Sequence, residues 1–322
     1  MQSLRIFTCA AAAAVAIASI SPASAQDQVK LTIGQRGNWD TAVAHLGDKA
    51  GIFKRNGLQL EMVYTSGSGE TLQPVVSGSV DLGIAVGTLG AIAAYAKGAP
   101  VRIVGAEATG AADYWYVKAS SPIKALKDTD GKTLAFSTQG SSTHSMVLAF
   151  IKEFGLKAKP QATGNPSATL TAVMTDQVDV GWAAPPFGLK EMDEGKIRLV
   201  AKATDASIVR GQTIRVIVAN AQALERRKDV LARFMQAYRE AIDYMYSDDP
   251  QVIKDYAEFT RTPEPMAKRV RDEFFPKELM QTAEIKGLDT LIPEAVELKY
   301  IPAPLNQQQL AELIQIQALA TR

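Results

Sequence analysis

The pattern of apolar and polar positions changes character along the chain. Over the first two thirds, short apolar runs alternate with amphipathic segments of 10 to 15 residues. One such segment places Met146, Val147, Phe150, Ile151 and Phe154 on a single helical face. The strand-like runs are LTIG, LQLEMVY, DLGIAV, VRIVGAEA, YWYVKA, KTLAF, VDVGWA, IRLVAKA and TIRVIVAN. This alternation predicts βαβ units and an α/β fold with mainly parallel sheets.

After about residue 220 the strand-like runs stop. A long helix is indicated by apolar residues at helical spacing, namely Val230, Leu231, Phe234, Met235, Tyr238, Ala241, Ile242 and Met245. Shorter helical segments follow, separated by Pro250, Pro263, Pro265, Pro276 and Pro293. The C-terminal third is therefore expected to be α-rich.

An internal repeat links two parts of the chain. Residues 54–85 and 152–183, compared without gaps at an offset of 98, share 11 of 32 residue types. Ordinary composition gives roughly two or three matches by chance. The clearest stretch is TLQPVVSGSVDLGIA against TLTAVMTDQVDVGWA. A period this long is not that of a solenoid. It predicts two similar α/β lobes with the same order of strands and helices.

The first 25 residues have the features of an export signal. Arg5 precedes the apolar run IFTCAAAAAVAIASI, and Ala23-Ser24-Ala25 has the small-x-small form of a cleavage site. The run is shorter than the roughly 20 residues of a membrane-spanning helix, although an N-terminal anchor is the alternative. We expect residues 1–25 to be a cleaved signal peptide and the mature protein to be periplasmic.

Composition narrows the function further. Cys9 is the only cysteine and lies in the expected signal, so disulfides and thiolate metal sites are not expected. The signal contains one charged residue, Arg5, which leaves 34 basic and 34 acidic residues in the mature chain. No basic bias indicates a nucleic-acid partner. We expect no cofactor and no metal.

Candidate binding loops lie where strands give way to helices. They form matched pairs: QRGNWD with STQGSSTHSM, TSGSGET with TGNPSAT, and VGTLG with APPFG. Ligands of open α/β sheets bind at the carboxyl ends of strands. Helix starts there offer free backbone N–H groups and a positive dipole end to an anion. For any single loop, plain helix capping by its Ser and Thr residues is an equally good interpretation.

Larger side chains add candidates with structural alternatives. Trp39 and Trp182 are placed to hold an apolar body from each rim of a cleft, or to pack in the core. His144 is a candidate anion donor or pH sensor, or a surface residue at a helix start. Arg36 and Arg215 are candidate partners of a carboxylate or sulfonate, and Arg215 alternatively faces solvent.

Catalytic motifs are missing. The sequence has no GxSxG elbow, P-loop or HExxH segment, and its two histidines are not spaced as metal ligands. We therefore expect a binding protein and not an enzyme.

The motifs AxxxGIFKRNGLQLE, VSGSVDLGIA and STQGSSTHSM, with the Gly-rich loop, resemble the solute-binding proteins of nitrate/sulfonate/taurine/bicarbonate-type ABC transporters. The resemblance extends over essentially the whole mature chain. It implies a type II periplasmic binding fold: two doubly wound α/β lobes, a two-strand hinge and an α-rich C-terminal part. Lobe one would combine residues 26–115 and 216–322, and lobe two would be residues 116–215. The crossings would lie near residues 113–120 and 213–220.

The resemblance also implies a function and a site. The protein would be a monomer that captures a small organic anion between its lobes and delivers it to an ABC permease. The anion would be a sulfonate or a carboxylate with an aliphatic or an aromatic body. An exported sensor that signals to a membrane receptor, and a binder of a pyrimidine-type heterocycle, are the alternatives. A catalytic branch with this fold carries clustered Cys, which the mature chain lacks. The expected ligand-binding residues are Arg36, Asn38, Trp39, Ser66, Gly67, Ser68, Gly69, Thr88, Gln139, Ser141, Ser142, Thr143, His144, Trp182 and Arg215.

Overall fold

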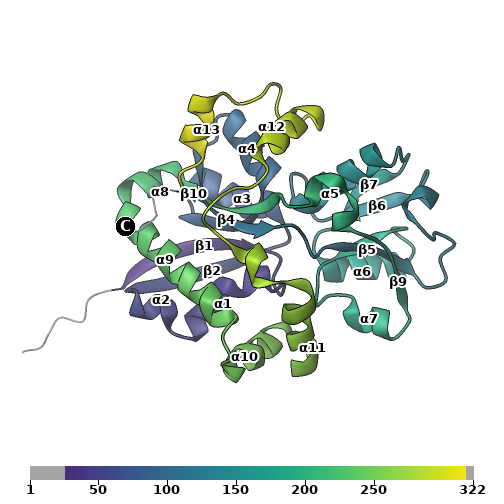
Figure 1. The fold of residues 1–322 in the computed structure, drawn as a ribbon, viewed down its shortest axis with the longest axis horizontal. Helices are drawn as coiled ribbons and strands as arrows, with labels where there is room; N and C mark the ends of the chain where they lie inside the picture. The colour runs from purple at the N-terminus through teal and green to yellow at the C-terminus, as the bar shows by residue number, and fades with distance from the viewer. Residues whose placement is uncertain (1–25, 317–322) are drawn as a thin grey trace, which may run out of the picture.

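The computed structural model describes residues 26–316 and contains two sheets, each flanked by helices (Figure 1). In the first sheet the strand order is β2-β1-β3-β10-β4. Strand β1 runs parallel to β2 and β3, whereas β10 is antiparallel to β3 and β4. The strands are β1 (Asp27–Gly34), β2 (Leu58–Thr65), β3 (Leu82–Gly87), β4 (Val101–Thr109) and β10 (Thr213–Asn220). We call this sheet and its helices lobe one.

The second sheet repeats the order of the first. Strand β5 lies between β8 and β9, and β6 pairs in parallel with β7. The backbone N–H of Ala135 in β6 donates to Val180 beside β8 at 2.9 Å, which joins these groups in the order β7-β6-β8-β5-β9. The strands are β5 (Tyr114–Lys118), β6 (Thr133–Phe136), β7 (Lys159–Ala162), β8 (Gly181–Ala183) and β9 (Ile197–Lys202). We call this sheet and its helices lobe two.

The sequence repeat is visible at atomic level. Thr65 and Thr71 share a hydroxyl–hydroxyl hydrogen bond of 2.6 Å, and Thr163 and Thr169 share one of the same length. The carboxylate of Asp81 accepts the N–H of Lys30. Its counterpart Asp179 accepts the N–H of Thr133, at the start of β6. The matched aspartates therefore make equivalent bonds to the neighbouring strands β1 and β6, which indicates a shared structural role.

Helices cover both faces of the lobe-one sheet. One buried cluster packs α1, α2 and α9 against one face, and a second packs α3, α4, α12 and α13 against the other. The helices before residue 200 are α1 (Val43–Lys49), α2 (Ile52–Arg55), α3 (Ser68–Ser77), α4 (Thr88–Ala96), α5 (Ser142–Glu153), α6 (Pro166–Met174) and α7 (Leu189–Asp193). Those that follow are α8 (Ala221–Arg226), α9 (Lys228–Met245), α10 (Pro250–Thr260), α11 (Glu264–Arg269), α12 (Leu288–Glu297) and α13 (Gln307–Leu313). The α-rich C-terminal part is confirmed.

Single turns complete the secondary structure. Five 3₁₀ segments are described, at Asp40–Ala42, Leu126–Asp128, Ala203–Asp205, Ser207–Val209 and Lys277–Met280, together with a π-helical turn at Val270–Phe274. Asp40–Ala42 leads directly into α1 and so continues the loop after β1. This placement matters because Asp40 belongs to the site described below.

The chain passes between the two sheets twice within this α/β part. It leaves lobe one after β4 and enters β5 through residues 110–113, and it returns from β9 to β10 through residues 203–212 (Figure 1). Both passages lie just before the strands expected to make the crossings. Trp115, at the first passage, packs edge-on against Phe150 and donates its indole N–H to Ala135, so it has a packing role.

The expected signal peptide, residues 1–25, lies outside the described residues. Within residues 26–316, no helix has the length and apolar character needed to cross a bilayer.

Candidate functional site

Loops from the two lobes meet face to face. The backbone N–H of Gly69 donates to the Thr138 hydroxyl at 3.2 Å, which joins the first turn of α3 to the loop after β6. A Cβ on Gly87 would lie 2.8 Å from the backbone nitrogen of Ser142, and one on Gly90 would overlap the carbonyl oxygen of Gly140. The carboxyl ends of the two sheets therefore face each other across a narrow, closed cleft.

The loop after β1 closes the cleft at another point. A Cβ on Gly37 would lie 2.9 Å from the ring of Phe187 in lobe two. Gly37 has a φ of 109°, in the region that favours glycine, so two constraints act on this position. The carbonyl of Phe187 in turn accepts the hydroxyl proton of Tyr114, which fixes its loop against β5.

Three helix starts converge at this cleft. Helices α3 and α4 begin after Gly67 and Gly87, and neither N-cap has a side chain that accepts a backbone N–H. Helix α5 begins beside them, with the Ser141 hydroxyl accepting the N–H of His144 at 3.1 Å. Backbone N–H groups and positive dipole ends from both lobes thus point at one region, which favours an anionic or acceptor group.

A buried charge cluster lies next to the start of α5. The Arg215 guanidinium donates through Nη1 to Asp40, through Nη2 to both oxygens of Asp113 at 3.0 and 2.8 Å, and through Nε to the Ser142 hydroxyl at 3.3 Å. Arg215 is 4% exposed, and the carboxylates are equally buried. Burial alone would lower the pKa of Arg215, but Asp113 and Asp40 raise it, so the guanidinium is charged. Burial raises the pKa of Asp113, an effect that Arg215 opposes.

Glu107 in β4 is the fourth ionisable residue of this cluster. It is 1% exposed, and neither carboxyl oxygen has a hydrogen-bond partner among the described residues. Burial raises its pKa well above the usual range, Asp40 adds to this effect and Arg215 opposes it. Burial therefore favours the protonated form of Glu107, while Arg215 already engages two aspartates. No cluster of metal-ligating residues is found between residues 26 and 316.

Other buried polar atoms in the cleft loops also lack partners. Both side-chain polar atoms of Asn38, the Oε1 atom of Gln35 and the indole N–H of Trp182 are buried without a partner within the described part of the chain. Asn38 and Trp182 are wholly buried. Because buried polar groups in native proteins are hydrogen-bonded in the great majority of cases, these residues mark places where a ligand or water would bind.

The aromatic residues do not lie at the cleft rims. Trp39 is wholly buried, packs edge-on against Tyr256 at 4.7 Å and donates to the Tyr246 hydroxyl at 3.0 Å. Trp39 therefore packs in the core beside Tyr246 and Tyr256, which is the structural alternative to a place at the cleft rim. Trp182 is buried opposite Trp115 in the pairing of β8 with β5, and only its unpartnered N–H keeps it a candidate.

The two candidate arginines behave differently. Arg36 is exposed and its guanidinium stacks 4.3 Å from the ring centre of Phe259. Its expected contact with a ligand acid group is not supported by this position. Arg215 lies at the centre of the cluster, so the solvent-facing alternative is wrong.

Several candidate hydroxyls hold the loops themselves. The Ser68 hydroxyl accepts the N–H of Gly87 and donates to Ala85, and the Thr88 hydroxyl donates to Thr213 at 2.6 Å. Thr143 accepts the N–H of Ser137 at 2.9 Å. Ser66 is half-buried, and its carbonyl accepts the Gln35 side-chain amide. Capping and loop bonding, the structural alternatives, therefore account for Ser68, Thr88, Ser141 and Thr143.

A groove on one side of the cleft contains further candidates. It is lined by Gly69, Gln139, Gly140 and His144, with Tyr300 from the C-terminal part. The Nδ1 atom of His144 lies 2.8 Å from the Tyr300 hydroxyl, a hydrogen bond between the lobes. Burial lowers the pKa of His144 to about 4, so the ring is neutral at neutral pH. His144 is thus an inter-lobe contact and not a surface residue.

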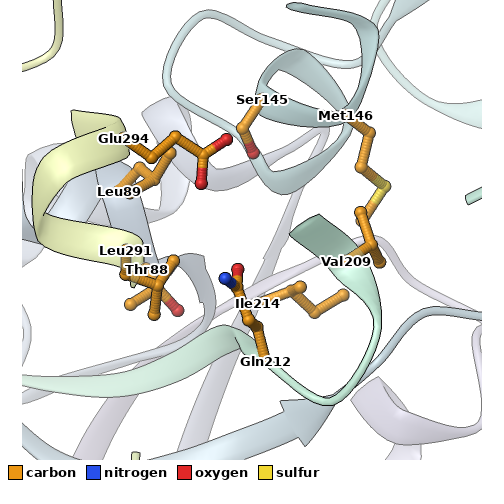
Figure 2. Close-up of a pocket in the computed structure, with 9 residues that line it drawn as sticks. All are labelled: Thr88, Leu89, Ser145, Met146, Val209, Gln212, Ile214, Leu291 and Glu294. Carbon is orange, nitrogen blue, oxygen red and sulfur yellow. The ribbon is translucent and has the colours of Figure 1, made fainter. Parts of the chain in front are cut away.

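A second, smaller pocket lies between α4, α5 and α12 (Figure 2). Glu294 points into it toward Ser145, and the Gln212 amide enters from the opposite side. Glu294 is 8% exposed and its Oε2 atom has no partner among the described residues. Burial raises the pKa of Glu294 to about 7, an effect that Lys152 opposes. Its walls come from both lobes, so the pocket is complete only when they are together.

Sequence reasoning missed several of these residues. Glu107 lies inside a strand-like apolar run, and Asp113 lies in a short connection; each was a lone acid in the sequence. The Oδ1 atom of Asp40 accepts the N–H of the adjacent Thr41 at 3.1 Å, but neither the turn Asp40–Ala42 nor α1 has a side-chain cap. The pairing of Asp40 with Arg215 joins residues 175 apart, which no local pattern shows.

The chain belongs to the family described as NMT1/THI5 like, which it matches over residues 19–252. A putative aliphatic sulfonates-binding protein of Escherichia coli is 26% identical over 258 residues, 75% of this chain and 79% of that protein. A 4-amino-5-hydroxymethyl-2-methylpyrimidine phosphate synthase of Saccharomyces cerevisiae is 22% identical over 241 residues, 69% of each chain.

The fold matches solved structures over nearly the whole chain. The alkanesulfonate-binding protein SsuA from Xanthomonas axonopodis pv. citri, bound to MOPS, superposes with a TM-score of 0.73 at 20% identity. The match covers 90% of this chain and 99% of that protein. The expected type II periplasmic binding fold and the expected family resemblance are both confirmed.

Proposed function

We propose that this protein is the substrate-binding component of an ABC importer, which captures a small organic solute with an acidic group between its lobes. The observation that carries this proposal is the closed cleft, where the starts of α3, α4 and α5 converge from both lobes. Helix starts of this kind bind sulfonates and carboxylates through backbone N–H groups. The similarity to a protein named as a sulfonate binder supports the same class of solute.

Closure of the cleft explains how binding of a solute would be signalled to a membrane permease. A solute that contacts the loops of both lobes binds the closed state better than the open one and shifts the population toward closure. The closed form would then be recognised by a membrane permease, with the protein acting as an exported monomer in the periplasm. Unpartnered polar atoms of Asn38 and Trp182 supply further hydrogen bonds to the solute.

Binding is favoured over catalysis by the contacts of the possible catalytic groups. His45 stacks on Phe259 with a centroid distance of 4.0 Å, and His144 bonds Tyr300. The hydroxyls of Ser141 and Thr143 bond each other at 2.9 Å. None of these contacts pairs a nucleophile with a base. The similarity to yeast synthases therefore does not lead us to propose catalysis for this chain.

A thermal-shift screen of the mature protein tests the proposal. The probes are alkanesulfonates, 2-aminoethanesulfonate, nitrate, bicarbonate, benzoate, phthalate and simple pyrimidines. A solute present at a hundred times its dissociation constant stabilises the native state by about 2.7 kcal/mol. A shift confined to organic acids supports the proposal. A shift with pyrimidines only, or with none of the probes, argues against it.

A further inference from the structure

Two ionisable side chains are buried where the lobes touch, and each belongs to a different lobe. Glu294 lies in α12 of lobe one and faces α5 of lobe two across the small pocket (Figure 2). His144 lies in α5 and contacts Tyr300, which follows α12. Glu294 is 8% exposed and His144 is 6% exposed. Separation of the lobes would return both groups to water.

The pocket around Glu294 suits a protonated carboxyl group. Its Oε2 atom has no partner within the described chain, and burial of an ionised carboxylate in this way is strongly disfavoured. The Ser145 hydroxyl, in the same pocket, already donates to the carbonyl of Ser142 at 2.8 Å. The Thr88 hydroxyl likewise donates to Thr213 at 2.6 Å. Both hydroxyls can still accept, and a carboxyl proton is a donor that an ionised carboxylate lacks.

The charged groups near Glu294 come from α5 and from α12 itself. Burial raises the pKa of Glu294 from 4.5 to about 7, Lys152 of α5 opposes this rise, and Glu153 and Glu297 add to it. Lys152 forms an ion pair of 2.5 Å with Glu297, so it is already engaged by another carboxylate. The walls from α4 and from residues 209–214 contribute no charged side chain to the described lining of the pocket.

The contacts of His144 favour a neutral ring. Its Nδ1 atom accepts the N–H of Gly140 at 3.4 Å and lies 2.8 Å from the Tyr300 hydroxyl. A protonated imidazole has a hydrogen on each nitrogen and could not accept there. Lys97 and Lys299 line the same groove, and its described lining contains no carboxylate. Burial accordingly lowers the pKa of His144 from 6.5 to about 4.

We propose that closure of the lobes exchanges protons at two places, because His144 releases a proton to solvent as it docks against Tyr300 and Glu294 takes one up from solvent as it enters the pocket. This inference rests on the proposed function, since it concerns the closed state that forms on solute binding. The net number of protons exchanged is then close to zero at mildly acidic pH.

The two groups have opposite effects on the pH dependence of closure. The closed state holds the proton of Glu294 more tightly than the open state, so Glu294 favours closure at low pH and this advantage is lost as pH rises. The closed state holds the proton of His144 less tightly, so His144 favours closure as pH rises. Together they keep the affinity for a solute nearly constant.

Titration calorimetry with two variants tests the exchange. The probes are ethanesulfonate and benzoate, whose acid groups stay ionised over the range used. Between about pH 5.5 and 7.5 we expect the dissociation constant of the wild-type protein to change by no more than about threefold. Glu294→Gln should bind about tenfold more tightly at the higher pH, and His144→Asn about tenfold more weakly.

Glu225→Gln, at an exposed position of α8, is the matched control and should behave as the wild-type protein does. If the pH profiles of the two variants run parallel to that of the wild-type protein, the inference is overturned while the proposed function stands. If neither probe binds at any pH, the proposed function fails and the inference fails with it.

Nuclear magnetic resonance of the histidines gives a readout on the unaltered protein. The chain contains two histidines, His45 and His144. We expect the His144 ring to titrate near about pH 6.5 without a probe and to stay neutral down to about pH 5 when a probe is saturating. His45 stacks on Phe259 within lobe one, so its titration should not change and serves as an internal control. A His144 ring that titrates identically in both states contradicts the exchange.

Discussion

Gly90 of α4 and Gly140 of lobe two are in backbone contact across the cleft: a methyl group on Gly90 would overlap the carbonyl oxygen of Gly140. Glycine at position 90 is therefore required for the two lobes to approach this closely. Residue 90 lies within a helix and has no left-handed backbone, so the constraint is the inter-lobe approach and not a turn.

Gly90→Ala should hinder full closure and weaken solute binding by about tenfold or more. Alanine also stabilises a helix interior by roughly 0.5–1 kcal/mol relative to glycine, so the folded lobe should not lose stability. Titration calorimetry and chemical unfolding measure the two effects.

Gly47→Ala is the matched control, because its Cβ would clash with Ala241 and Phe53 inside lobe one. It should reduce stability while the inter-lobe contact is unaffected. If Gly90→Ala binds solute as tightly as the wild-type protein, the lobes do not close to the observed distance.

Replacing Arg215 by methionine should destabilise the protein strongly. Removal of the cation leaves Asp40 and Asp113 buried without compensation, and breaking a buried ion pair in this way costs about 3–5 kcal/mol. Chemical unfolding should show part of this loss recovered when Asp113→Asn is added.

Arg233→Met is the comparison, since its ion pair with Asp27 is partly exposed and should contribute no more than about 1 kcal/mol. Equal losses for the two variants would mean that the buried cluster does not behave as a desolvated charge pair.

Thr143 is expected to act on stability more than on binding. Thr143→Val keeps the shape of the side chain but leaves the buried N–H of Ser137 without its acceptor, which should cost about 1–3 kcal/mol. Thr171→Val, at an exposed position of α6, should change stability by no more than about 0.5 kcal/mol. A large loss of solute affinity in Thr143→Val with unchanged stability would instead show direct contact with the solute.

Glu294 should make stability depend on pH. Burial raises its pKa from the ordinary 4.5 to about 7, so the folded protein binds more protons than the unfolded chain between these values. The contribution of Glu294 to the free energy of unfolding therefore falls as pH rises from about 4.5 to 7 and is lowest above that range. Lys152 opposes this shift, and Glu153 and Glu297 add to it. All three residues are unchanged in the variant used below, Glu294→Gln.

Glu294→Gln removes this penalty, so it should raise the melting temperature more at pH 8 than at pH 4.5. His144, whose pKa burial lowers to about 4, acts in the opposite direction but is common to both proteins. A difference in melting temperature that does not vary with pH would show that Glu294 is not desolvated by the inter-lobe pocket.

Much of the fold could be predicted from the sequence because its signals are local. Alternating apolar runs indicated the α/β lobes, and the offset of 98 residues matched Asp81 with Asp179, which make equivalent hydrogen bonds. The loops of the cleft were found because helix starts need Gly, Ser, Thr or Asn. The same property makes capping and ligand binding look alike in sequence, which is why Ser141 and Thr143 were candidates.

The charge cluster could not be predicted, because its members lie far apart in the sequence. Arg215 meets Asp40 and Asp113 only because β10 returns to lobe one after the whole of lobe two. In the sequence, Trp39 has the position expected of an aromatic residue at the rim of a cleft. In the structure it packs against Tyr246 and Tyr256, which come some 200 residues later in the chain. Long-range packing decides both cases, and a single sequence does not show it.

Distance measurement between the lobes tests the central claim most directly. The mature chain is expected to have no cysteine, so Val63→Cys in lobe one and Met174→Cys in lobe two, both exposed, give specific spin-label sites. Double electron–electron resonance should show a broad inter-label distribution without solute and a single narrow one when a solute that shifts the melting temperature is added. A distribution that stays the same with and without such a solute would contradict capture by lobe closure.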